Sequence, residues 1–133
     1  MSCESGSKTR GNTRVLVVED DAEVLRFLQE LLVANDYQVI EARNGVEAMV
    51  ALTAPASQLP HVVVLDLGLP LESGVSVLTF VRNVMQSGLP VIVLTGRSDA
   101  EEEAAVRELG VSAYLRKPAS AQSVLAALSR ALG

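Results

Sequence analysis

Residues 62–66 read VVVLD, a short run of apolar, mostly β-branched residues that ends in a carboxylate. Such a run is typical of a strand buried on both faces, as the strands of parallel sheets are. Residues 15–18 (VLVV) and 91–94 (VIVL) have the same character, and shorter strand patterns lie at residues 37–41 and 113–115. The sequence therefore predicts five strands.

Helical patterns alternate with these strands. Apolar residues recur at spacings of three and four in five segments, residues 24–32, 44–52, 74–85, 99–109 and 120–132. Strict alternation with short loops favours right-handed crossovers and a parallel sheet covered on both faces. A length of 133 residues suits one domain. We therefore predict a single doubly wound α/β domain.

Composition narrows the class of protein. With 49% hydrophobic and 20% charged residues, the chain resembles an ordinary globular protein. The net charge of −5 and the lack of a basic stripe argue against direct nucleic-acid binding, and no apolar run is long enough to span a membrane. Residues 1–13 are polar and are expected to form a flexible leader before a folded domain at residues 14–133. Its Cys3 is the only cysteine, which fits a cytoplasmic protein.

Polar side chains follow four of the predicted strands. In doubly wound sheets, functional groups collect beyond the carboxyl ends of the strands. These positions hold Glu19, Asp20 and Asp21 after the first strand, Asp66 after the third, Thr95 after the fourth, and Lys117 with Pro118 after the fifth. Separate loops are thus expected to deliver carboxylates, a hydroxyl and an ammonium to one edge.

This set of groups suits phosphoryl transfer. Close carboxylates repel one another unless a cation lies between them, and oxygen ligands of this kind suit Mg²⁺. Glu19, Asp20 and Asp66 supply the charge. An ionised Asp66 can attack phosphorus to give an aspartyl-phosphate. The Thr95 hydroxyl can donate to one phosphoryl oxygen, and Lys117 can neutralise another.

Each residue also has an ordinary structural interpretation. Asp20 with Glu23 fits a capping box for the first helix as well as it fits metal binding. An aspartate after a strand, such as Asp66, is often a turn residue. Thr95 alone indicates little, and a lysine before a proline is usually solvated. The prediction of a site therefore rests on the coincidence of all four loops.

The motifs resemble those of the receiver domains of bacterial two-component signalling, over residues 14–132. Four signatures carry the resemblance: the acidic pair in VLVVEDD (15–21); Asp66 with Pro70 and Gly74 four and eight residues later; VIVLTG (91–96), which ends in Thr95 and Gly96; and Tyr114 three residues before Lys117–Pro118. Four such motifs in the expected order are a specific match.

The resemblance implies a flavodoxin-like fold, with strand order 2-1-3-4-5 and five helices. It implies that Asp66 accepts a phosphoryl group from a histidine kinase or a histidine phosphotransfer protein. It also implies a signalling domain that controls a downstream protein or an output domain, and that catalyses only its own phosphorylation and dephosphorylation.

The same resemblance implies roles for individual residues. Glu19, Asp20 and Asp66 would hold Mg²⁺ together with the backbone carbonyl of Gly68. Thr95 and Tyr114 would form a switch pair. The Lys117–Pro118 bond would be cis, and positions Gly68 and Arg97 would tune the lifetime of the phosphate. We hypothesise that the long cationic side chain of Arg97 lies over the site.

Some positions depart from the common pattern, and other functions compete. Ala119 stands where many relatives carry Phe, and Gly68 lacks the larger side chain often found there. One alternative is an interaction module that binds partners without phosphate. A second is a dehalogenase-type phosphatase, but that family needs another aspartate at position 68. A nucleotide-binding fold would need a glycine-rich first turn in place of Glu19, Asp20 and Asp21. Dimerisation stays open, although the charged helix at residues 99–109 makes an apolar dimer patch there doubtful.

Overall fold

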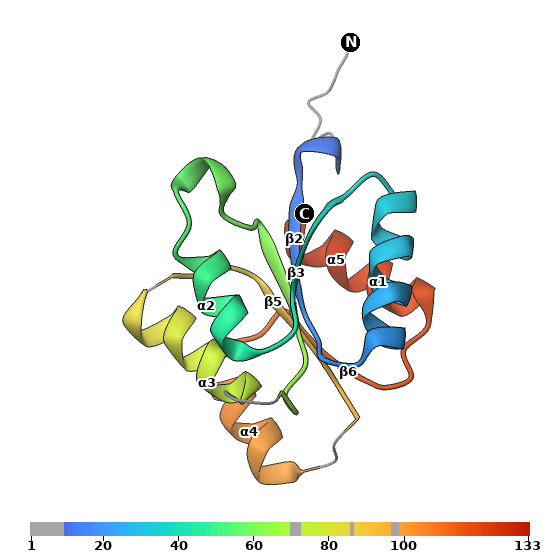
Figure 1. Ribbon diagram of the computed structural model, residues 1–133. Coiled ribbons are helices and arrows are strands. Elements are labelled where there is room, and N and C mark those ends of the chain that lie inside the picture. Colours follow the sequence, from blue (N-terminus) through green and yellow to red (C-terminus); the bar gives the residue numbers. More distant parts are fainter. Residues whose placement is uncertain (1–9, 70–72, 86, 97–98) are drawn as a thin grey trace.

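A computed structural model describes residues 10–69, 73–85, 87–96 and 99–133. Its centre is a five-stranded sheet in which all neighbouring strands are parallel, in the order β3-β2-β4-β5-β6 (Figure 1). The strands are β2 (Arg14–Val18), β3 (Gln38–Ala42), β4 (Val62–Leu65), β5 (Val91–Thr95) and β6 (Ala113–Arg116). Numbered along the chain, this is the order 2-1-3-4-5, so the predicted fold is confirmed.

Helices cover both faces of the sheet. On one face lie α1 (Ala22–Ala34) and α5 (Ala121–Leu132); on the other lie α2 (Gly45–Leu52), α3 (Gly74–Thr79) and α4 (Ala100–Leu109) (Figure 1). Two 3-10 turns, η1 (Arg10–Asn12) and η2 (Ala56–Gln58), complete the surface. Because parallel strands need crossover connections, this two-sided cover follows from the alternation in the sequence.

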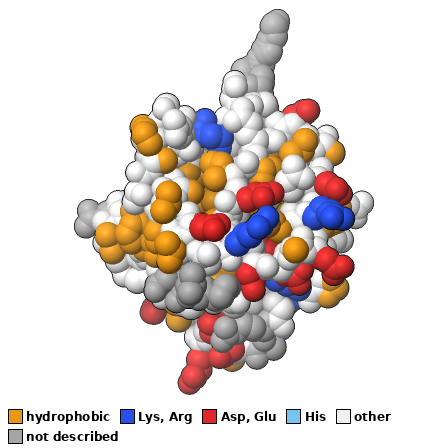
Figure 2. Space-filling model, in the orientation of Figure 1, with side chains coloured by type: hydrophobic (Ala, Val, Ile, Leu, Met, Phe, Trp, Pro, Cys, Tyr) orange, Lys and Arg blue, Asp and Glu red, His pale blue; other side chains and the backbone are white. Residues whose placement is uncertain are grey.

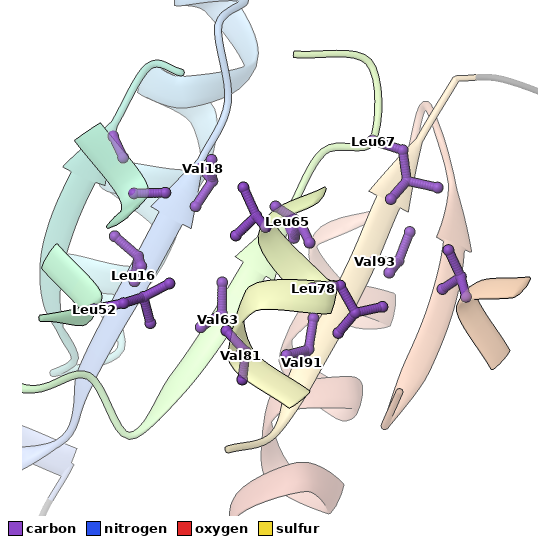
Figure 3. Packing of buried hydrophobic residues seen from close by; sticks show 14 residues of the cluster. Leu16, Val18, Leu52, Val63, Leu65, Leu67, Leu78, Val81, Val91 and Val93 are labelled. Carbon is purple, nitrogen blue, oxygen red and sulfur yellow. The ribbon is translucent and has the colours of Figure 1, made fainter. Parts of the chain in front are cut away.

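The central strands divide the hydrophobic core into two clusters. Alternate side chains of one strand point to opposite faces. In β2, Leu16 and Val18 join the cluster under α2, α3 and α4, while Val15 and Val17 join the cluster under α1 and α5. Figure 3 shows the first cluster, with Leu78 of α3 lying over the side chains of β4 and β5. Burial of each such side chain stabilises the fold by about 1.5–3 kcal/mol.

Side-chain caps explain where the helices begin. A short polar side chain just before a helix accepts hydrogen bonds from backbone N–H groups that have no partner inside the helix. The capping residues are Asp21 for α1, Asn44 for α2, Ser73 for α3, Asp99 for α4 and Ser120 for α5. At the other end of α4, Gly110 has a φ of 92°, a conformation that favours glycine.

The helix expected at residues 74–85 is interrupted. After α3, the chain widens into a π-helical turn, η3 (Phe80–Val84). Arg82 in this turn donates hydrogen bonds to the carbonyl oxygens of Ser87, at 2.8 Å, and Gly110, at 2.9 Å. The guanidinium thereby satisfies carbonyls just after η3 and at the end of α4. Because these acceptors lie outside the helix, apolar periodicity could not predict the change of helix type.

Some apolar side chains of the helical patterns do not face the core. Val46 and Val50 of α2 are 52% and 68% exposed, and Ala105 of α4 is also exposed. Hydrophobic side chains gather on the side of Figure 2 where α2 and α3 lie, whereas acidic and basic ones intermingle elsewhere on that face. Within the described parts of the chain, no helix is long and apolar enough to cross a membrane.

The described part of the expected leader lies against the edge strand. The Gln38 backbone N–H donates to the Thr13 carbonyl at 2.9 Å, and its side chain donates to the Gly11 carbonyl at 2.6 Å. Residues 1–9, with Cys3, lie outside the described residues. These contacts place residues 10–13 beside β3, at the end of the sheet opposite its carboxyl edge.

Candidate functional site

Backbone hydrogen bonds carry three of the predicted site residues to one edge of the sheet. The N–H of Glu19 donates to Ala42 at 2.9 Å, and that of Asp66 donates to Val18 at 3.0 Å. The N–H of Lys117 donates to Thr95 at 2.9 Å. Each residue therefore continues the sheet pairing just beyond a strand, which fixes the start of its loop.

Three carboxylates meet at this edge. Glu19, Asp20 and Asp66 each offer an oxygen, and these oxygens lie within 4.8 Å of one another. Glu19 is 1% exposed and Asp66 is 6% exposed, whereas Asp20 is exposed to solvent. Buried charges of like sign destabilise a fold unless cations compensate them. The cluster contains only hard oxygen donors and is open on the Asp20 side, so it fits Mg²⁺.

Lys117 supplies the compensating charge within the protein. Its Nζ lies 2.8 Å from Oε1 of Glu19 and 3.5 Å from Oδ2 of Asp66. The peptide bond between Lys117 and Pro118 is cis. The ammonium and the two buried carboxylates, which are far apart in the sequence, thus form one contact group. This arrangement gives Asp66 both a cationic neighbour, Lys117, and acidic neighbours, Glu19 and Asp20.

Burial and charge shift the proton affinities of this group. Burial raises the pKa of the Glu19 carboxyl, and the charge of Asp66 raises it as well, against the hydrogen bonds from Lys117 and the Asp21 N–H. Burial lowers the pKa of the Lys117 ammonium, but its hydrogen bond to Glu19 and the charges of Asp66 and Glu19 outweigh that effect. The pKa of Lys117 therefore lies above its usual value, and the ammonium stays charged.

The other predicted site residues are Thr95, Gly68, Tyr114 and Arg97. Thr95 is fully buried and ends β5, the strand that pairs with β4. The Gly68 N–H donates to Oδ1 of Asp66 at 3.2 Å. Tyr114 is partly buried in β6 and packs against the cluster under α2, α3 and α4. Arg97 lies outside the described residues, as does Pro70 of the second motif.

The structure separates the two interpretations of the acidic pair. The cap of α1 is Asp21, whose side chain accepts hydrogen bonds from the N–H groups of Glu23 and Val24. The capping-box interpretation of Asp20 was therefore wrong by one residue. The Asp21 N–H also donates to Oε2 of Glu19 at 3.0 Å, which orients that carboxylate. Asp21 therefore caps the helix, and Asp20 is the solvent-exposed member of the acidic cluster.

This division predicts effects of different size for two neighbouring substitutions. In metal-free buffer, Asp21→Ala should lower the free energy of unfolding by about 1 kcal/mol because α1 loses its cap. Asp20→Ala should change it by less than about 0.5 kcal/mol, since an exposed charge next to like charges is removed. Urea unfolding of both variants measures the difference. An equal loss for the two would show that the cap is wrongly assigned.

Gly74 is a site residue whose structural role the sequence did not reveal. A Cβ atom at this position would clash with the backbone carbonyl of Asp66 and would lie 2.5 Å from the Cα atom of Leu67. The Gly74 N–H donates to the Leu67 carbonyl at 3.1 Å. The start of α3 thus rests directly on the backbone that carries Asp66. In the sequence, Gly74 is recognisable as part of a motif because it lies eight residues after Asp66. The motif does not predict that the two residues are in contact.

Comparisons with known proteins identify the family of this chain. Residues 15–129 match the family model of the response regulator receiver domain. The transcriptional regulatory protein KdpE of Mycobacterium tuberculosis is 40% identical over 120 residues, which cover 90% of this chain and 51% of KdpE. The transcriptional regulatory protein PrrA of the same organism is 40% identical over 105 residues, 79% of this chain and 43% of PrrA. The chain thus spans about half the length of these curated relatives.

A solved structure extends the similarity to the fold. The CheY-like response regulator receiver domain protein of Methanospirillum hungatei JF-1 superposes with a TM-score of 0.83 at 23% identity, covering 90% of this chain and 93% of that one. At this identity the match bears on the fold alone. With the family match over most of the sequence, the conclusion is that this chain belongs to the response regulator receiver domain family of two-component systems.

Proposed function

We propose that Asp66 accepts a phosphoryl group from a phosphohistidine on a histidine kinase or a histidine phosphotransfer protein. The observation that carries this proposal is the contact group of Asp66, Glu19 and Lys117 at the carboxyl edge of the sheet. A nearly buried carboxylate between acidic and cationic neighbours has the chemistry of a nucleophile whose charge is balanced in place.

In the proposed transfer, a carboxylate oxygen of Asp66 attacks phosphorus opposite the imidazole nitrogen of the donor. The new P–O bond forms as the P–N bond breaks, and the imidazole nitrogen keeps the bonding electron pair. Most of the rate advantage in such reactions comes from positioning and charge neutralisation. Two features support this positioning: the backbone hydrogen bond from the Asp66 N–H to the Val18 carbonyl, and the close packing of Gly74 against the backbone of Asp66.

Glu19, Asp20 and Asp66 would hold Mg²⁺, with the Gly68 carbonyl as a further protein ligand. When bound, the ion supplies positive charge against the phosphoryl oxygens. Lys117 would exchange its contact with the acids for one with a phosphoryl oxygen. The Thr95 hydroxyl would donate to another. Gly68 and Arg97 would set how long the aspartyl-phosphate lasts.

The response would pass through Thr95 and Tyr114. A phosphoryl group adds about −1.5 to −2 charges, and it shifts a conformational equilibrium only if one conformation binds it better. A Thr95 hydroxyl drawn toward the phosphoryl group would leave space for the Tyr114 ring to turn inward. The relatives are named as transcriptional regulators, so we extend the proposal to an output domain or partner protein that reads this change.

Acetyl phosphate, a small phosphodonor, tests the proposal without a cognate kinase. With Mg²⁺, the native chain should gain one phosphoryl group, measured by intact-protein mass spectrometry. With the metal removed by EDTA, the gain should disappear, because the carboxylates and the donor then repel each other. An unmodified chain in the presence of both reagents would contradict the proposal and favour an interaction module that works without phosphate.

A further inference from the structure

The guanidinium group of an arginine lies over the ring of Tyr114. The guanidinium carbon of Arg107, on α4, lies 5.3 Å from the centre of the Tyr114 ring, on β6. This distance is within the range of a cation–π interaction. Tyr114 is partly buried, while the Arg107 side chain is 57% exposed, so the contact lies on the surface between α4 and β6.

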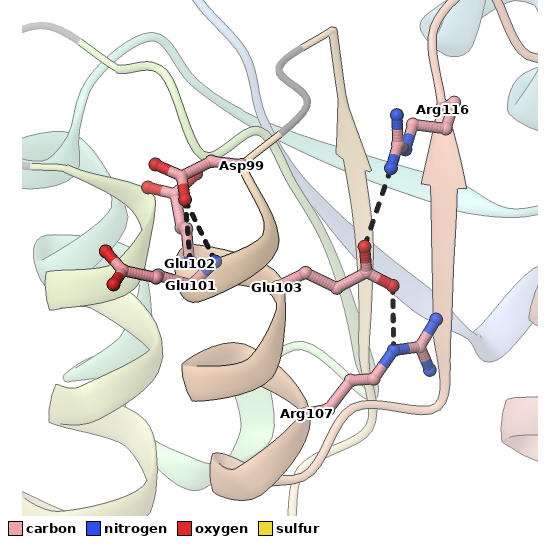
Figure 4. Close-up of polar contacts among 6 residues, drawn as sticks. All are labelled: Asp99, Glu101, Glu102, Glu103, Arg107 and Arg116. Carbon is pink, nitrogen blue, oxygen red and sulfur yellow. Dashed lines mark hydrogen bonds and ion pairs between the residues drawn. The ribbon is translucent and has the colours of Figure 1, made fainter.

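Glu103 holds this arginine in place. Its Oε2 lies 3.0 Å from Nε of Arg107, one turn further along α4, and its Oε1 lies 3.5 Å from Nη2 of Arg116 on β6. Figure 4 shows Glu103 between the two arginines, with α4 on one side and β6 on the other. Exposed ion pairs contribute little stability. The effect of Glu103 is to orient Arg107, because one carboxylate fixes two guanidinium groups.

Burial and nearby charges shift the pKa of the Tyr114 phenol. Burial raises the pKa of Tyr114, and the nearby negative charge of Glu103 raises it further, while Arg116 and Arg107 act against this. The phenol therefore stays neutral at physiological pH, and the ring keeps the electron distribution that attracts a cation to its face.

We infer that Arg107 is a positioning residue for Tyr114: braced by Glu103, it holds the ring at the α4–β6 surface and so opposes the switch. This inference rests on the proposed function, in which the ring turns inward after phosphorylation. Turning inward would break the contact with Arg107, so the contact stabilises the resting conformation alone. A ligand at Asp66 must then overcome that preference, which weakens its apparent affinity.

The magnitude follows from the strength of exposed cation–π contacts, which corresponds to about a two- to five-fold change in an equilibrium constant. Removing the cation should therefore strengthen the apparent binding of a phosphoryl mimic by about two- to five-fold. A role of Arg107 in folding alone would not produce this effect, because a uniform loss of stability does not favour one folded conformation over another.

The chain offers a direct spectroscopic readout, because it contains only two tyrosines, Tyr37 and Tyr114. Incorporation of 3-fluorotyrosine gives two fluorine NMR signals, and Tyr114→Phe assigns them. Beryllofluoride with Mg²⁺ serves as the phosphoryl mimic. The variants are Arg107→Met, which removes the cation but keeps an unbranched apolar chain, Arg107→Lys, which keeps a cation, and Arg130→Met, which makes the same change at an exposed position on α5.

In Arg107→Met, the Tyr114 signal of the ligand-free protein should move toward its beryllofluoride-bound position, and the titration midpoint should fall by about two- to five-fold. Glu103→Gln should cause a smaller change in the same direction. Arg107→Lys should fall between Arg107→Met and the native chain, and Arg130→Met should match the native chain.

Two results would overturn the inference while leaving the proposed function intact. One is an unchanged Tyr114 signal in Arg107→Met; the other is a moved signal with the same beryllofluoride midpoint as the native protein. A native chain that does not respond to beryllofluoride and Mg²⁺ at all would instead overturn the proposed function, and this inference with it.

Discussion

Asp66→Asn should abolish phosphorylation by acetyl phosphate and Mg²⁺, with no phosphorylated protein detectable by mass spectrometry. The amide is neutral and is a far weaker nucleophile than a carboxylate, so the P–O bond cannot form at this position. The substitution also removes one of the three acidic side chains of the cluster, and Mg²⁺ binding should weaken. This is the largest effect that we expect from a single atom-for-atom change.

The fold should survive this substitution. An amide oxygen can still accept the hydrogen bond that Oδ1 of Asp66 receives from the Gly68 N–H, and Lys117 keeps its 2.8 Å contact with Glu19. Loss of a buried negative charge beside Glu19 relieves repulsion, so urea unfolding should show unchanged or higher stability.

Asp21→Asn is the matched control for Asp66→Asn. Asparagine caps helices as well as aspartate does, so this variant should fold and accept phosphate like the native chain. If Asp66→Asn still gained a phosphoryl group, another residue would be the acceptor. The assignment of Asp66 would then be wrong even though the family is not in question.

Gly74→Ala should both destabilise the protein and slow phosphorylation. The added methyl group would overlap backbone atoms of Asp66 and Leu67, and no side-chain rotation can relieve a clash with backbone. Overpacking of this kind costs up to about 3 kcal/mol. A displacement of Asp66 by about 1 Å can slow the reaction by about 100-fold. Urea unfolding and the initial rate with acetyl phosphate measure the two effects.

Gly88→Ala provides the comparison, because a Cβ atom there would meet nothing within 4 Å. Its stability and phosphorylation rate should stay close to those of the native chain. A Gly74→Ala variant as stable and as fast as Gly88→Ala would mean that α3 can move away from β4 at little cost, and that the close contact does not position Asp66.

Much of the fold could be predicted because its signals are local. The runs at residues 15–18, 62–65 and 91–94 are continuous and apolar, and each becomes a central strand buried on both faces. Once these strands are parallel, their carboxyl ends share one edge. The sequence could therefore predict that Glu19, Asp66 and Lys117 lie at the same edge. The 2.8 Å contact between Lys117 and Glu19 could be found only in the structure.

Features that depend on a one-residue register or on contacts between distant elements could not be predicted. Asp20 and Asp21 are equally good caps in a sequence, and the choice depends on where α1 begins. Val50 fits a helical apolar pattern yet is exposed, because the face of α2 that packs on the sheet is set by Ala48 and Leu52. The Arg107 contact with Tyr114 joins two elements and leaves no periodic pattern.

The contact between Gly74 and Asp66 also limits how the backbone around Asp66 can move. The start of α3 and the end of β4 touch backbone to backbone, and neither can approach the other any further. The start of α3 therefore gives the backbone of Asp66 a rigid support. A phosphoryl group on Asp66 would therefore not be accommodated by moving the start of α3 closer to β4.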